Sequence, residues 1–142
     1  MIRQEELSLI EEMIRMRKAL DRCEITTALW ESDKPSGIIP VARESGAACI
    51  IENDMYVFGG FSREVFNDLR ILDLNNHQWR VVDYESSEAK NSAPSPRYCH
   101  SMVSYANRFL VVFGGAGNFV KEMNVRPCKN DLFVFDSHST YW

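Results

Sequence analysis

The chain has few of the features that mark membrane and nucleic-acid-binding proteins. No apolar run exceeds five residues, the length of the run at 109–113, whereas a membrane-spanning helix needs roughly 20. The formal net charge is -4, so the chain has neither a basic field for nucleic acid nor a Lys/Arg cluster for acidic lipid. We therefore expect no nucleic acid and no membrane among its partners.

Signals for export are also missing. The four cysteines are scattered without a CxxC pair, which predicts free thiols. Glu5, Glu6, Glu11 and Glu12 crowd the first turns, whereas a signal peptide starts with basic residues and a mitochondrial presequence is poor in acids. These features predict a cytosolic or nuclear chain, and we assign it to the cytoplasm.

The residue patterns of known catalytic sites are absent from the sequence. His77, His100 and His138 lie on separate segments and have no metal-ligand spacing with Cys or Asp. The Gly-Gly-Ala-Gly stretch at 114–117 follows an apolar segment but lacks the Lys-Ser/Thr of a phosphate-binding loop. We expect no catalytic residue, no metal and no cofactor, so the chain is predicted not to be an enzyme.

What the sequence does contain is an internal repeat. Residues 67–73 and 130–136 both begin with Asn-Asp-Leu and end with Asp, and a Trp follows eleven residues after Asp68 and after Asp131. Upstream, each copy has an apolar stretch closed by a glycine pair, at 55–60 and at 110–115. The copies keep the same order, which indicates two structural repeats.

The only large difference between the copies is one loop. Asp68 lies eight positions after Gly60, and Asp131 lies sixteen positions after Gly115. Still further upstream, Arg43 and Arg97 each follow a proline-containing link. We place the insertion in a surface loop between two strands, where extra length is tolerated.

Together these residues resemble the kelch repeat: an Arg after a proline-rich link, a strand, an apolar strand ending in Gly-Gly, an Asp-led strand and a Trp. The resemblance covers about residues 30–142, with Ser45-Gly46 in the first copy matched to His100-Ser101 in the second. The positions with a structural role in this motif are Arg43, Gly59, Gly60, Asp68, Trp79, Arg97, Gly114, Gly115, Asp131 and Trp142.

The resemblance implies an all-β fold of kelch-type β-propeller blades, each with four antiparallel strands. We predict one blade in residues 45–95 and a second in 96–142 that is cut at its last strand, so the ring is incomplete. The predicted strands cover 46–52, 55–60, 68–74, 79–83, 99–106, 109–115 and 131–136. We expect the glycine pairs to allow positive φ, the two Asp side chains to bond to loop amides, and the Trp side chains to pack between blades.

Residues 1–22 differ in kind from the repeats. Apolar residues at helical spacing predict an amphipathic helix over 1–22, which could dock on the same chain, on a partner or on its own copy. Residues 23–44 are interpreted as a partial blade strand and link, in which Trp30 and Ser36-Gly37 resemble the end of a preceding blade.

Propellers present their binding loops at one mouth of a rigid scaffold, which predicts a protein-interaction module or scaffold. The loops at 61–66 and 117–126 should share that mouth, and their aromatic side chains either face a partner or pack back on the blade. The predicted partner-binding residues are Arg63, Glu64, Phe66, Phe119, Lys121 and Arg126.

Other functions stay open at this point. Kelch proteins include substrate adaptors of ubiquitin ligases, so the chain could be a non-catalytic targeting propeller of a larger enzyme assembly, with a ligase or a phosphatase. A galactose-oxidase-like domain is a further alternative, for which Tyr98 and His100 are the only close pair of metal-ligand types. We interpret the chain as part of a longer protein, and unpaired blade faces predict self-association.

Overall fold

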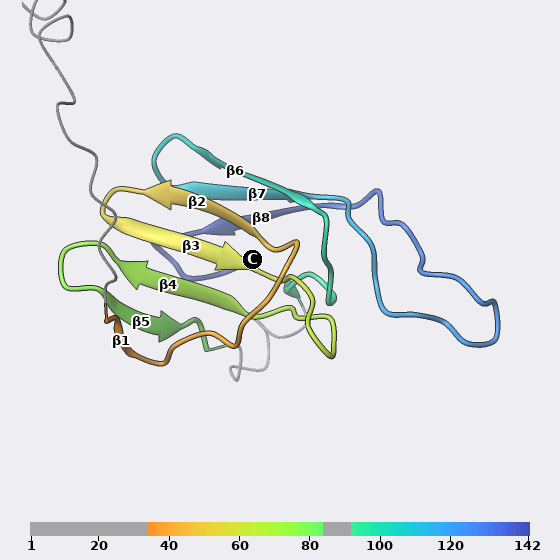
Figure 1. Cartoon of the computed structure of the whole chain (residues 1–142). Coiled ribbons are helices and arrows are strands. Elements are labelled where there is room, and N and C mark those ends of the chain that lie inside the picture. Colours follow the sequence, from red (N-terminus) through yellow and green to blue (C-terminus); the bar gives the residue numbers. More distant parts are fainter. Residues whose placement is uncertain (1–33, 84–91) are drawn as a thin grey trace, which may run out of the picture. The chain divides into compact units, whose positions relative to one another are not determined.

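The computed structural model describes residues 34–83 and 92–142, all of which belong to one unit, Lys34–Trp142. Their strands form two sheets, as expected for an all-β fold (Figure 1). The predicted helix over 1–22, Trp30 and residues 84–91 lie outside the described residues.

Four strands of the first sheet form the first blade: β2 (Ala47–Ile51), β3 (Asp54–Phe58), β4 (Leu69–Asp73) and β5 (Gln78–Val81). Each pairs antiparallel with the next, as predicted from the first repeat. Alternation of side chains along the pleat places one set of residues toward the second sheet and the other set on the opposite face. The observed strands are a few residues shorter than predicted because their ends pass into loops and turns.

A short extra strand enlarges the first sheet. β1 (Ser36–Gly37) pairs parallel with β5, with Ser36 next to Gln78. The Ser36 N–H donates to the His77 carbonyl at 3.0 Å, and the Ile38 N–H donates to the Trp79 carbonyl at 2.9 Å. The sequence interpretation gave Ser36-Gly37 to a preceding blade, and this is corrected: the segment satisfies the outer edge of the first blade, which would otherwise have unpaired backbone groups.

The second sheet contains β6 (Ser101–Tyr105), β7 (Phe109–Phe113) and β8 (Leu132–Asp136), paired antiparallel in that order. It matches the predicted blade without its last strand. Asp136 also bridges to Tyr141, so the chain turns back along β8 before Trp142. We call the two sheets blade 1 and blade 2.

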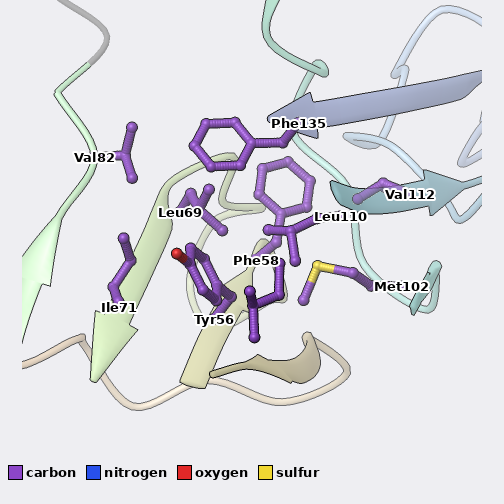
Figure 2. Close-up of a cluster of buried hydrophobic side chains, with 10 residues drawn as sticks. Tyr56, Phe58, Leu69, Ile71, Val82, Met102, Leu110, Val112 and Phe135 are labelled. Carbon is purple, nitrogen blue, oxygen red and sulfur yellow. The ribbon is translucent and has the colours of Figure 1, made fainter. Parts of the chain in front are cut away.

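The apolar core lies between the two blades (Figure 2). Tyr56 and Phe58 of β3 face the second blade, where Leu110, Val112 and Phe135 are almost completely buried. These side chains come from alternate positions of their strands, since each strand presents every second residue to one face. Burying side chains of this size stabilises the fold by about 1.5–3 kcal/mol each.

The two tryptophans occupy equivalent places with different neighbours. The Trp142 ring packs against Phe58 of blade 1 and against Phe133 and Phe135 of blade 2, with centroid separations of 5.1, 6.5 and 5.2 Å. Trp79 lies opposite Leu72, on the face of blade 1 directed away from blade 2. Packing between blades, predicted for both residues, is therefore seen within this chain at Trp142.

Candidate functional site

Each blade has two ends with different construction. The long connections β3–β4 and β7–β8, together with the links that contain Arg43 and Arg97, lie at one end, which we call the loop end. Tight turns at 52–53, 74–77 and 106–108 lie at the other, the turn end (Figure 1). Binding residues concentrate on loops carried by a rigid scaffold, so the loop end is the candidate site.

Arg43 anchors the base of the loop end in blade 1. Its guanidinium donates to both carboxylate oxygens of Asp68, at 2.6 and 3.0 Å, and to the Gly59 carbonyl at 3.0 Å. Burial acts to raise the pKa of Asp68, but hydrogen bonds from Arg43 and Arg70 outweigh it, and the pKa is lowered.

Arg97 repeats this arrangement in blade 2. Its side chain is fully buried and donates to Asp131 at 2.7 and 3.0 Å and to the Gly114 carbonyl at 3.1 Å. The hydrogen bond from Arg97 is the main cause of the lowered pKa of Asp131. The expectation that Asp68 and Asp131 bond chiefly to loop amides is therefore wrong. Their main partners are arginines, because a planar guanidinium can bond both carboxylate oxygens and a carbonyl at once.

The glycine pairs lie where the chain leaves each blade in close contact with neighbouring backbone. Gly59 has a φ of 60°, and a Cβ there would lie 2.5 Å from the Arg97 carbonyl oxygen. Gly115 has a φ of 93°, and a Cβ there would lie 2.7 Å from the Tyr98 carbonyl oxygen. Both requirements exclude other residues, since an L side chain would be strained and would also collide with backbone.

Backbone hydrogen bonds join the two blades at the loop end. The Gly60 N–H donates to the Arg97 carbonyl at 2.9 Å, and the Arg97 N–H donates to the Phe66 carbonyl at 3.0 Å. Phe66 also has its ring 4.5 Å from the Arg43 guanidinium. Such direct bonds fix the β3–β4 loop on the first residues of blade 2, which makes this part of the site rigid.

The structure also corrects the alignment of the two repeats. Ser45 and Cys99 both have positive φ, 54° and 53°, at the same place after the motif arginine. Gly46 is therefore the counterpart of His100, one residue away from the match made on the sequence. The extra residue of the second repeat lies in the next turn. Two residues separate the paired Ile51 and Asp54 in blade 1, whereas three separate the paired Tyr105 and Phe109 in blade 2.

His100 is buried between the blades. Its ring packs edge-on against Phe58 at 5.3 Å, and neither ring nitrogen makes a hydrogen bond of normal geometry. Desolvation and the nearby Arg97 charge lower the pKa of His100 to about 4, with only slight opposition from the Phe58 backbone. The ring is neutral at pH 7 and acts as a packing group.

The insertion in the second repeat forms a hydrogen-bonded loop between β7 and β8. At its base, Ala116 bridges to Tyr98 and Cys128, and the Lys129 N–H donates to the Gly115 carbonyl at 2.8 Å. At its tip, Val120 and Val125 bridge to each other, with the Val120 N–H donating to the Val125 carbonyl at 2.8 Å. We call residues 119–126 the tip hairpin.

The tip hairpin exposes apolar side chains. Phe119, Met123 and Val125 are 45%, 65% and 46% exposed. Lys121 and Glu122, in the turn between them, are exposed as well. A cluster of exposed apolar residues held on a hydrogen-bonded loop is characteristic of an interaction surface.

Arg126 connects the tip hairpin to blade 1. Its guanidinium carbon lies 5.3 Å from the Phe61 ring centroid, 5.7 Å from that of Tyr98 and 5.9 Å from that of Phe119. Phe61 and Tyr98 also pack on each other at 5.7 Å. Cation–π contacts of this kind hold the guanidinium in place while the residue stays exposed.

The predicted site residues thus divide into groups. Phe119, Lys121 and Arg126 belong to the tip hairpin, whereas Arg63 and Glu64 are exposed on the β3–β4 loop. Glu64 and Phe66 share an open hollow of about 420 Å³ with Asn118, so the two loops do meet. Phe66 is half-buried beneath Arg43, which matches the alternative in which an aromatic packs back on the blade.

Sequence reasoning missed four contributors to this surface. Phe61 and Tyr98 support Arg126, and Met123 and Val125 add exposed apolar area. Met123 and Val125 lay inside the predicted loop, and their apolar character there was the available signal. No sequence signal placed Tyr98 beside Phe61, because they come from different repeats.

The described part of the chain contains no group of three His, Cys, Asp or Glu side chains that could hold a metal ion. Tyr98 and His100 have different neighbours, the first beside Arg126 and the second against Phe58. Over residues 34–83 and 92–142, no helix is long and apolar enough to cross a membrane.

The family model described as the KLHDC2/KLHL20/DRC7 Kelch-repeats domain matches residues 12–142. The chain belongs to the kelch-repeat family. Among curated relatives, this kelch chain is 33% identical to acyl-CoA-binding domain-containing protein 4 of Arabidopsis thaliana over 82% of its own length. It is 30% identical to kelch domain-containing protein 3 of Rattus norvegicus over 84% of its length, and 27% identical to host cell factor 2 of Homo sapiens over 80%.

This kelch chain is short beside those relatives. The match covers 16% of the Arabidopsis protein, 31% of the rat protein and 16% of the human protein. The family assignment therefore concerns the repeats, and it confirms the kelch resemblance found in the sequence.

Proposed function

We propose that the chain is a non-catalytic protein-binding module that contacts its partner through the loop end. The observation that carries this proposal is the tip hairpin, which presents exposed apolar side chains beside an arginine held by three aromatic rings. Aromatic residues, Met and Arg are enriched in the cores of protein interfaces. Kelch-repeat domains bind protein partners, which agrees with this chemistry.

The hydrogen bonds of the loop end favour tight binding. Backbone bonds hold both the base and the tip of the β7–β8 connection, and the ring contacts hold Arg126. A surface that is ordered before binding loses less conformational entropy when the partner arrives. Phe66 is assigned to support the hollow rather than to contact the partner. The proposed contact residues are Arg63, Glu64, Phe119, Lys121, Met123, Val125 and Arg126.

A second candidate is the targeting unit of a larger enzyme assembly. The observation in its favour is that the chain spans only 16% to 31% of the relatives described above. In that case the partner on the loop end is the enzyme's substrate. We place either form in the cytoplasm, which imaging of a tagged chain would test.

The experiment starts with capture of the partner by a photo-reactive amino acid. The probe replaces Met123 in one protein and Leu74, in a turn at the other end, in the control. The proposal expects a specific protein adduct from position 123 and none from position 74. Equal capture at both positions would contradict a loop-end site.

Affinity measurements with the captured protein then assign energies. Phe119→Ala and Arg126→Ala should each weaken binding by roughly 30-fold, since truncating a central hot spot costs about 2 kcal/mol or more. The matched controls are Leu74→Ala, an apolar change at the turn end, and Arg80→Ala, an exposed arginine on β5. Binding that is unchanged by Phe119→Ala and Arg126→Ala would place the site elsewhere.

A further inference from the structure

The Arg126 side chain is surrounded by aromatic rings. Its guanidinium carbon lies over the rings of Phe61, Tyr98 and Phe119, at 5.3, 5.7 and 5.9 Å from their centroids. Within residues 34–83 and 92–142, the guanidinium makes no hydrogen bond and no ion pair. Ring faces alone therefore hold this positive charge, which is how aromatic cages bind cations. We call Phe61, Tyr98 and Phe119 the ring site.

Two of the three rings stand on backbone that is fixed by hydrogen bonds. Phe61 and Glu44 exchange two bonds from N–H to carbonyl, each of 2.9 Å. Tyr98 and Ala116 exchange two such bonds, of 3.1 and 2.9 Å. The Phe61 and Tyr98 rings also pack on each other, with their centroids 5.7 Å apart. These two rings can therefore stay in place when Arg126 moves.

Arg126 can leave the ring site without breaking a hydrogen bond. It is exposed and belongs to the tip hairpin, where Val120 and Val125 bond to each other. No backbone hydrogen bond joins residues 118–126 to a described residue of either blade. Cation–π contacts at an exposed site are weak, so rotation of the Arg126 side chain into solvent empties the ring site.

The chemistry of the ring site favours a methylated ammonium group over the resident arginine. A guanidinium has five N–H donors, and those of Arg126 find no acceptor among the described residues. Donors that lose water without gaining a partner cost free energy. A trimethylammonium group has a positive charge and no N–H donor, so it meets no such cost against the rings.

The approach to the ring site is open. A hollow of about 480 Å³ is lined in part by Glu44, Phe61 and Arg63. Glu44 and Arg63 are both exposed, and their charges are opposite. Arg43 also lines the hollow, but its guanidinium is paired with Asp68. Since these charges largely cancel, the ring faces decide which ligands bind, and ring faces select cations.

We infer that the ring site binds a trimethylammonium group, such as that of a methylated lysine or of choline, in exchange for Arg126. This ligand is separate from the protein partner assigned to the loop end. Its effect on that partner rests on the proposed function, in which Arg126 held by the rings is a contact residue. Because the ligand displaces Arg126, ligand and partner should weaken each other's binding by the same factor.

The test compares the full chain with its Arg126→Ala variant, in which the ring site is empty. The probes are choline and N-acetyl-trimethyllysine amide, and NMR titration of the aromatic proton signals measures their binding. A site that is open for only part of the time binds with an affinity reduced by that fraction. Arg126→Ala should therefore bind the probes about three- to sixfold more tightly. Equal affinities, or no saturable binding to either protein, would overturn the inference.

A neutral ligand separates cation binding from apolar binding. In the carbon isostere of choline a tert-butyl group replaces the trimethylammonium group, so the shape is kept and the charge is lost. The isostere should bind Arg126→Ala at least about threefold more weakly than choline does. Equal binding of the two would show that the rings select apolar groups, and would overturn the inference.

Ring variants made on Arg126→Ala locate the probe. Phe61→Leu and Tyr98→Leu should each weaken binding about two- to fivefold, because each removes one ring face. Tyr98→Phe, the matched control, keeps the ring and should keep the affinity. Unchanged binding in both Leu variants, with the β-sheet circular dichroism of the unmodified chain retained, would place the probe elsewhere and overturn the inference.

The two probes also separate the two sources of the ligand. Tighter binding of the trimethyllysine probe assigns the ring site to a protein side chain, and tighter binding of choline assigns it to a small molecule or a lipid headgroup. All these titrations use the chain without its partner. Failure of the probes therefore removes the ring site alone, whereas failure of partner capture from the loop end removes the proposed function alone.

Discussion

Blade 1 and blade 2 have the same plan, yet equivalent residues meet different surroundings. Phe58 is 0% exposed and Phe113 is 51% exposed, although each ends the equivalent strand of its blade, β3 or β7, just before a glycine pair. The hydrogen bonds at the loop end differ less between the blades, since Arg43 and Arg97 each bind an aspartate and a glycine carbonyl. The comparison teaches that local motif chemistry fixes the loop end of each blade, whereas the energetic role of a face depends on whether a neighbour covers it.

The largest effect should separate Phe58 from Phe113. Phe58→Ala should lower the free energy of unfolding by about 3–5 kcal/mol, because it opens a cavity in the core between the blades. Phe113→Ala should change it by less than about 1 kcal/mol in single chains, since the side chain is already half exposed. Urea unfolding at low protein concentration measures both. Equal losses would remove the distinction between the two faces.

The next comparison is between the motif arginines. Arg97→Met should lower the free energy of unfolding by about 2–3 kcal/mol. This value lies at or below the usual cost of breaking a buried ion pair, because Asp131 is 41% exposed. Arg43→Met should cost less, about 1 kcal/mol, because Asp68 keeps its bond to Arg70. Parallel urea denaturation curves give the two values. A larger loss at Arg43 would contradict this ranking.

A pH-dependent difference should follow from His100, which has glycine as its counterpart in blade 1. Because the folded-state pKa is lowered from 6.5 to about 4, the unfolded chain binds the proton first as pH falls. Stability from this group is complete above pH 6.5 and is lost between pH 6.5 and about 4. The loss should be about 1–3 kcal/mol over that window.

The matched control for this pH effect is His100→Leu, which keeps an apolar side chain at the site. The free energy of unfolding of the variant should fall less than that of the unmodified chain between pH 6.5 and 4. His77 and His138 are present in both proteins, so their contribution cancels. Parallel pH profiles for the two proteins would show that His100 is not buried in its neutral form.

The smallest effect should be at Arg126, which contrasts with Arg97 in exposure. Arg126→Ala removes contacts to three rings on an exposed loop, and such contacts contribute about 0.5–1 kcal/mol in total. The unfolding midpoint should therefore shift little, although partner binding weakens by roughly 30-fold. A destabilisation as large as that of Arg97→Met would make Arg126 a structural residue and would remove it from the proposed contact surface.

Sequence reasoning located the strands because strand period, glycine pairs and the Asp-to-Trp spacing are local signals. The motif positions from Arg43 to Trp142 were found in the same way. The partners of Asp68 and Asp131 were not, because Arg43 and Arg97 lie 25 and 34 residues away along the chain. The parallel pairing of β1 was missed for the same reason, since two residues carry no strand pattern of their own.

The candidate site was predicted in part. Loop position after each glycine pair pointed to Arg63, Glu64, Phe119, Lys121 and Arg126, and the structure places these residues at the loop end. The turning of Phe66 beneath Arg43 and the stacking of Arg126 on Phe61 and Tyr98 depend on contacts between repeats. Such contacts leave no trace in the spacing of residues within one repeat.

Hydrogen exchange of the full chain with and without its captured partner tests the central claim most directly. We expect the partner to slow amide exchange in residues 61–66 and 117–128 and to leave the turns at 52–53 and 74–77 unchanged. Slower exchange at those turns, with none at the loop end, would contradict the assignment of protein binding to the loop end.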